Sequence, residues 1–126
     1  MSDEEIVGFI TDEEIYQRLG DIVSKFKLLE CDKCAMAVVQ WLKSYGINGT
    51  LLKLETKYND EDFVLSTRLE QLGIGESITR NGIHYGVEVR GKVFDNLSKM
   101  GMSREDWIKD FHSFSDEFEI EIIEKF

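Results

Sequence analysis

The first third of the chain carries two stripes of apolar residues at helical spacing. The first stripe consists of Ile15, Leu19, Ile22 and Phe26. Thr11-Asp-Glu-Glu14 precedes it and fits a capping box, so the pattern predicts a helix over 12–26. The second stripe consists of Cys31, Ala35, Val38, Leu42 and Tyr45. It predicts a helix over 31–45, which ends before Gly46.

The rest of the chain is typical of short strands separated by turns. Strands are expected over 50–56, 84–90, 92–95 and 118–123, where β-formers are frequent and apolar and polar residues partly alternate. Weaker patterns predict a short strand over 63–65, a helical turn over 67–72, a strand at Ile78, and a short helix capped by Ser103 that runs through Trp107 and Phe111. Helices first and an antiparallel sheet second indicate an α+β fold.

The composition fits one globular domain over 1–126, with an acidic segment at 1–10. The 126 residues are 42% hydrophobic and 32% charged, and the formal net charge is −10. An acidic surface repels phosphate groups, so neither nucleic acid nor a membrane surface is an expected partner. The chain shows neither a basic secretory leader nor an apolar stretch long enough to span a bilayer, so a cytoplasmic location is expected.

Two cysteines, Cys31 and Cys34, lie at the predicted start of the second helix. They are too few for a disulfide scaffold or a four-cysteine zinc site. The unpaired N–H groups and the positive end of the helix dipole favour a thiolate at Cys31. Lys33 adds to this effect, whereas Glu30 and Asp32 oppose it. Cys31 is therefore a candidate nucleophile, and the alternative is a small apolar residue at the start of a core helix.

His84 begins the predicted strand 84–90. The apolar residues of that strand share one face, which places His84 on the opposite, polar face, so it need not be a core residue. An imidazole there, opposite a helix start, could serve a cysteine nucleophile as proton acceptor and donor. The alternative is a solvated strand histidine. The other histidine, His112, is expected on the surface.

Asp95 ends the strand that follows the strand of His84, so strand pairing would bring its carboxylate beside the imidazole. Asn96 could do the same as an amide. The alternative is an Asp-Asn pair that opens a turn. A metal site is a weaker alternative, because the two cysteines and His84 leave a ligand missing unless Asp95 supplies it.

Taken together, these motifs resemble a known family. The motifs are Cys31-x-x-Cys34-Ala35, Tyr-Gly46-Ile47-x-Gly49, Asn81-Gly-x-His84-x-Gly86, Val-Phe94-Asp95-Asn96 and Trp107. They resemble the papain-fold toxin domains of bacterial polymorphic toxin systems, most of all the papain fold toxin 2 subgroup. The likeness covers most of the chain and implies a papain-like (transglutaminase-like) fold, with N-terminal helices packed on an antiparallel sheet.

The resemblance also implies roles for the candidate residues. Cys31 would be the nucleophile, His84 the general acid and base, and Asp95 the carboxylate that orients the imidazole. Cys34 would take the place of an apolar residue behind the nucleophile. In the papain-type signature itself the second cysteine of a C-x-x-C pair attacks, so Cys34 stays an alternative nucleophile and Asn96 an alternative orienting group.

The implied activity is acyl transfer from a carboxamide of a protein substrate, as in a glutamine deamidase-type toxin, with no cofactor. The alternatives are a cysteine peptidase and a catalytically inactive papain-fold module that binds a basic protein. An immunity protein is a further expected partner. The backbone N–H of Cys31 is one expected oxyanion donor, and Gln17 and Asn81 are candidates for a side-chain donor.

Overall fold

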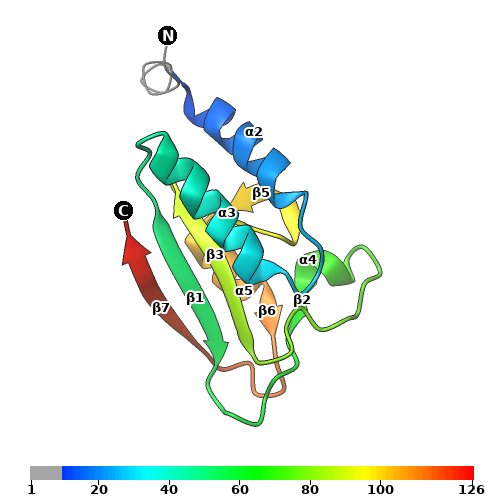
Figure 1. The fold of residues 1–126 in the computed structure, drawn as a ribbon. Helices are drawn as coiled ribbons and strands as arrows, with labels where there is room; N and C mark the ends of the chain where they lie inside the picture. Colours follow the sequence, from blue (N-terminus) through cyan, green and yellow to red (C-terminus); the bar gives the residue numbers. More distant parts are fainter. Residues whose placement is uncertain (1–9) are drawn as a thin grey trace.

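The computed structural model describes residues 10–126 (Figure 1). All of the expected acidic segment except Ile10 therefore lies outside the described residues. The elements in chain order are α2 (Asp12–Val23), α3 (Cys31–Ser44), β1 (Thr50–Thr56), β2 (Leu65–Ser66), α4 (Thr67–Glu70), β3 (Ile83–Val89), β4 (Lys92–Asp95), β5 (Ser98–Met102), α5 (Arg104–Lys109), β6 (Phe111–His112) and β7 (Phe118–Lys125). Within this part of the chain, no helix has the length and apolar character needed to cross a membrane.

Five strands form one antiparallel sheet with the order β5-β4-β3-β1-β7. The strands β2 and β6 form a separate two-stranded sheet. Helices α2 and α3 lie on one face of the larger sheet, and α5 lies on the other (Figure 1). The expected α+β fold, with N-terminal helices packed on an antiparallel sheet, is confirmed.

Apolar side chains fill both faces of the larger sheet, because its strands alternate their side chains between the two sides. Toward α2 and α3 the buried residues include Leu19, Val38, Leu42, Val87 and Val89. Toward α5 and β6 they include Leu52, Leu54, Val93, Trp107 and Phe111. Trp107 and Phe111 of the second cluster lie against His84, one of the candidate catalytic residues.

Helix α2 ends at Val23 and not at the predicted residue 26. The backbone N–H of Ser24 donates to the carbonyl of Gly20, and the Ser24 hydroxyl donates to the carbonyl of Asp21, which closes the helix with a tight turn. Phe26 lies beyond the helix but still packs against the core, so the apolar residue at this position reports burial and does not report helical structure.

Other differences lie in the short elements. Strand β5 was not predicted, because it lacks alternation and is held by pairing with β4 and by the close approach of Gly101 to the Phe94 ring. Ile78 is not in a strand, although its N–H donates to the carbonyl of Val64. Phe111 belongs to β6 and not to the helix before it.

Candidate active site

The carboxylate of Asp95, at the end of β4, is the centre of a buried hydrogen-bond network. Its Oδ2 accepts from Nε2 of His84 at 2.9 Å, from Nε1 of Trp107 at 2.9 Å and from Nη2 of Arg68 at 2.8 Å. Its Oδ1 accepts from Nη1 of Arg68 at 2.9 Å and from the backbone N–H of Leu97 at 3.1 Å. Every donor around this carboxylate fixes its position and favours its charged form.

The register of the sheet explains why His84 and Asp95 meet. Strands β3 and β4 pair so that Val87 lies opposite Phe94. The same register places Gly86 opposite Asp95, and His84 points to the same face because it lies two residues from Gly86. The predicted pairing of these two strands therefore brings the imidazole and the carboxylate together.

His84 is fully buried, so the alternative of a solvated strand histidine is wrong, and the polar face of its strand is not exposed at this residue. The rings of Trp107 and Phe111 cover that face, at centroid distances of 6.1 Å and 5.1 Å from the imidazole. Gly86 makes this cover possible, because a Cβ there would lie 2.8 Å from Cζ2 of Trp107. The polar face of the strand is thus an internal face, and its cover comes from elements that follow it in the chain.

The carboxylate also sets the tautomer and charge of the imidazole. An ionised carboxylate only accepts hydrogen bonds, so Nε2 of His84 carries the proton of the bond to Asp95. Burial acts to lower the pKa of His84, but the bonds to Asp95 and the nearby Cys31 outweigh burial and raise this pKa to about 9. Burial acts to raise the pKa of Asp95, but His84 and Arg68 hold it well below its ordinary value of 3.8.

Cys31 is the first residue of α3, and 8% of it is exposed. Glu30, which precedes it, provides no side-chain cap, and the first backbone N–H groups of the helix find no acceptor within residues 10–126. The thiol donates to the carbonyl of Ile83 with Sγ and O 3.9 Å apart, which ties the helix start to the start of β3. The thiol therefore lies beside the unpaired N–H groups at the start of α3.

One nitrogen of His84 is left for this thiol. Nε2 is committed to Asp95, whereas Nδ1 is buried and has no partner with hydrogen-bond geometry in the described part of the chain. Cys31 is nevertheless close enough to contribute to the pKa of His84. The structure thus brings Cys31, His84 and Asp95 into one cluster.

A cleft of about 320 Å³ lies in front of Cys31. The segment before β3 lines it together with the helix start, and Asn81 belongs to that segment. Oδ1 of Asn81 accepts from Oγ1 of Thr79 at 2.8 Å and from the N–H of Ile83 at 3.1 Å, and its Nδ2 group has no acceptor within residues 10–126. Gln17, the other candidate donor, lies on α2 and lines a different pocket.

Cys34 and Asn96, the alternative nucleophile and the alternative orienting group, have other surroundings than the imidazole of His84. Cys34 is 1% exposed, and burial, followed by Asp95 and Cys31, raises the pKa of Cys34 to about 12. Nδ2 of Asn96 donates to the carbonyl of Lys27 at 2.8 Å and so ties the end of β4 to the segment before α3. Cys34 is a core thiol in this arrangement, and Asn96 holds a loop.

Two charged residues that the sequence did not single out lie behind Asp95. Arg68 of α4 donates through Nε to Oδ2 of Asp110 at 2.8 Å, in addition to its bonds to Asp95. Asp110 also accepts from the Ser66 hydroxyl and from the Arg68 backbone N–H. Arg68 is 27 residues from Asp95 and 42 from Asp110, so no local pattern could reveal the pairing.

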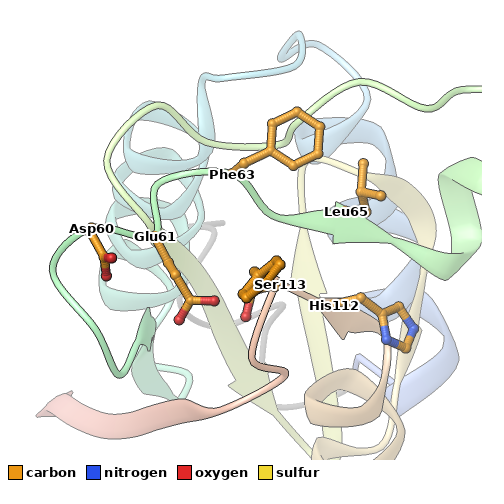
Figure 2. A pocket seen from close by; sticks show the side chains of 7 residues that line it. Asp60, Glu61, Phe63, Leu65, His112 and Ser113 are labelled. Atoms are coloured by element: carbon orange, nitrogen blue, oxygen red, sulfur yellow. The ribbon is translucent and has the colours of Figure 1, made fainter.

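A larger pocket, of about 500 Å³, lies elsewhere and contains none of the three clustered residues. It is lined by Asp60, Glu61, Phe63, Leu65, His112, Ser113 and Phe114 (Figure 2). His112 is exposed, as expected, with Nε2 2.7 Å from Oγ1 of Thr67. We place the candidate chemistry in the smaller cleft, because a nucleophile and its base define such a site and volume does not. Among residues 10–126, no three His, Cys, Asp or Glu side chains are grouped to hold a metal ion.

Comparison with protein families adds an independent observation. A family model described as papain fold toxin 2 matches residues 14–112. Comparison with curated proteins and with solved structures gave no match. The matched segment runs from α2 to β6 and contains the Cys31, His84 and Asp95 cluster, and it confirms the papain-like fold expected from the sequence motifs.

Proposed function

The chain belongs to the papain fold toxin 2 family, and on this premise we propose that it is a cysteine-dependent toxin enzyme that deamidates glutamine side chains of a protein target. One observation carries the proposal. The bond from Nε2 of His84 to Asp95, 2.9 Å long, leaves Nδ1 for a thiol that begins a helix. A nucleophile, a base and a group that orients the base are the parts that acyl transfer needs.

The first step is attack by the thiolate of Cys31. In the thiolate–imidazolium form of the pair, Nδ1 of His84 already carries the proton. The Cys31 sulphur forms a bond to the carboxamide carbon of the substrate as the electrons of the C=O double bond move to the oxygen. The imidazolium is stabilised by Asp95, whose pKa stays low beside Arg68. A pKa of about 9 for His84 supports an imidazolium at neutral pH.

Negative charge then develops on the carbonyl oxygen of the substrate. The backbone N–H of Cys31 is one donor for this oxygen, because it has no other acceptor among residues 10–126. The free Nδ2 group of Asn81, in the same cleft, is the second. Both donors are held in advance, which is the condition for stabilising the tetrahedral intermediate strongly.

The intermediate collapses when the imidazolium donates its Nδ1 proton to the amide nitrogen. The C–N bond breaks, ammonia leaves, and the acyl group stays on Cys31 as a thioester. Water then gives a proton to Nδ1 of His84 and attacks the thioester carbon, the C–S bond breaks, and the sulphur leaves as the thiolate while Nδ1 keeps its proton. The product is a glutamate side chain. With a peptide bond as substrate, the same steps would release an amine.

The test is to incubate proteins from bacterial cells with the purified chain and with Cys31→Ala, and to map the modified positions by mass spectrometry. We expect glutamine-to-glutamate conversion at a small set of sites, with wild type only. New protein N-termini in place of conversions would show a peptidase. Absence of both would contradict an enzymatic role and favour the binding module.

Cys34→Ala is the matched control, because it removes the other cysteine of the same helix turn. It should retain the conversions, since Cys34 is buried and has a pKa of about 12. A toxin with this activity also needs an inhibitor in the producing cell. We propose an immunity protein that covers the cleft in front of Cys31.

A further inference from the structure

The two helices cover only part of their face of the sheet. Helix α2 packs on β5 and β4, and α3 packs on β3. Strands β1 and β7 lie beyond α3 and are not covered by either helix (Figure 1). Side chains of β1 and β7 on this face therefore lie beside the outer flank of α3.

A groove of about 480 Å³ runs between that flank and the uncovered strands. Its apolar lining includes Met36 and Val39 of α3, Leu51 of β1, Tyr85 of β3 and Ile123 of β7. Met36 is 57% exposed and Ile123 44% exposed. Large apolar side chains exposed together in a groove are typical of a surface that binds another molecule.

The groove adjoins the cleft in front of Cys31. Asp32 and Tyr85 line both of them. A chain whose carboxamide lies against the sulphur can therefore continue along the outer flank of α3 without leaving the surface. Because the two hollows share these residues, the groove is a candidate extension of the active site.

The charges around the groove select the partner. Lys43 is paired with Glu124 at 2.6 Å, and Lys53 is paired with Glu121 at 3.2 Å. Asp32, at the junction of the groove and the cleft, makes no hydrogen bond or ion pair within residues 10–126. Among the charged residues that line the groove, the carboxylate of Asp32 is thus the unpaired one, and it favours a basic residue in a segment that lies along the groove. Arg80, whose charge is opposite, lines the cleft and not the groove.

We propose that this groove binds the segment of the target protein that flanks the modified glutamine. The segment is extended, with an apolar side chain seated on Met36 and Ile123 and a lysine or arginine opposite Asp32. The proposal rests on the proposed function for the identity of the reaction, but binding itself requires no turnover. Full burial of one large apolar side chain favours binding by about 10-fold or more.

The experiment measures binding of labelled peptides to the Cys31→Ala chain by fluorescence anisotropy. The probes are peptides of equal length with a central glutamine, whose flanking positions carry leucine or serine and lysine or glutamate. We expect the leucine and lysine peptide to bind about 10-fold more tightly than the serine and glutamate peptide. Equal affinity for all of the peptides, or no binding, would overturn the proposal.

Substitutions test which residues of the groove produce the two peptide preferences. Met36→Glu should abolish the preference for leucine, and Asp32→Asn should abolish the preference for lysine over glutamate. Met100→Glu is the matched control, because Met100 is 75% exposed on β5 and does not line the groove. Loss of the preference in Met100→Glu, or its retention in Met36→Glu, would overturn the proposal.

The result of the peptide-binding experiment can be distinguished from the result of the glutamine-conversion experiment that tests the proposed function. Peptide binding with the expected preference, together with no glutamine conversion by wild type, would keep the groove and reject the deamidase. Conversion of glutamine by wild type without any peptide preference would keep the deamidase and reject the groove.

Discussion

Arg68 holds both oxygens of the Asp95 carboxylate, with Nη1 2.9 Å from Oδ1 and Nη2 2.8 Å from Oδ2. The same guanidinium donates to Asp110 through Nε. Two buried carboxylates are thus matched by Arg68 and by a protonated His84. Because Asp95 also holds the imidazole, the position of His84 depends on a residue that does not touch it.

Substitution of Arg68 by glutamine should destabilise the fold by about 3–5 kcal/mol, because it leaves Asp110 buried without its cation and leaves Asp95 with His84 alone as a charged partner. Urea unfolding followed by circular dichroism measures this loss. Arg104→Gln is the matched control. Arg104 also makes two bonds to one carboxylate, Glu88, but its side chain is 38% exposed, so its loss should cost at most about 1 kcal/mol. Equal losses in the two variants would contradict the importance of the buried pair.

Gly86→Ala should loosen the indole that covers the imidazole. The new Cβ would lie 2.7 Å from Cγ1 of Val93 and 2.8 Å from Cζ2 of Trp107, so Trp107 must shift and its bond to Asp95 must weaken. We expect a loss of about 1–3 kcal/mol in unfolding free energy, and a change in the emission of the buried tryptophan. Gly75→Ala is the control, since a Cβ there meets nothing within 4 Å. Unchanged stability in Gly86→Ala would contradict this packing.

Much of the fold could be predicted from the sequence, because the longer elements carry their own pattern. Helix α3 and the strands β1, β3, β4 and β7 begin and end close to their predicted limits. Their signals are local patterns: an apolar stripe at helical spacing, an alternation of apolar and polar residues, or a glycine at a turn. Strand β5 has no such signal, because its partner β4 and the Phe94 ring determine its place.

The candidate site, too, could be predicted only in part. Cys31, His84 and Asp95 could be singled out because each begins or ends a predicted element, and strand pairing then brings the last two together. The burial of His84 and the role of Arg68 could not be predicted, because each depends on a contact with a residue far away in the sequence: Phe111 for His84 and Asp95 for Arg68. The polar face of β3 lies inside the protein at His84, because the rings of Trp107 and Phe111 cover it.

Stability should fall as the pH rises through the alkaline range. The pKa of His84 is about 9 in the folded chain against its ordinary 6.5, so the stabilisation is complete below about 6.5 and is lost by about 9. Asp95 acts at the acid end: its depressed pKa stabilises the fold above its ordinary 3.8, and this contribution is lost as the pH falls further. Urea unfolding across the pH range measures both effects. His84→Gln should lack the alkaline decline, and an identical decline in this variant would contradict a raised pKa.

Brief labelling with sub-stoichiometric iodoacetamide should modify Cys31 and spare Cys34. Cys31 lines the cleft, whereas Cys34 is 1% exposed and its pKa is about 12. Mass spectrometry with peptide mapping identifies the labelled residue. His84→Ala should slow the labelling by about 10-fold or more, because the thiol loses its proton acceptor. Cys34→Ala should leave the labelling intact and cost about 1 kcal/mol of stability. Equal loss of labelling in both variants would contradict the assignment of Cys31.

Asn81→Ala should lower turnover of a carboxamide substrate by about 100-fold to 1,000-fold, as expected when one oxyanion donor is removed. Asn81 lines the cleft, and its Oδ1 is held by Thr79 and Ile83, so its Nδ2 group is the part of the side chain that can serve as the donor. Alkylation of Cys31 by iodoacetamide should be unchanged in this variant, since alkylation forms no oxyanion. Gln17→Ala is the control, because Gln17 lines a different pocket and should not affect turnover. A loss of turnover in Gln17→Ala with none in Asn81→Ala would contradict the assignment of Asn81 as the oxyanion donor.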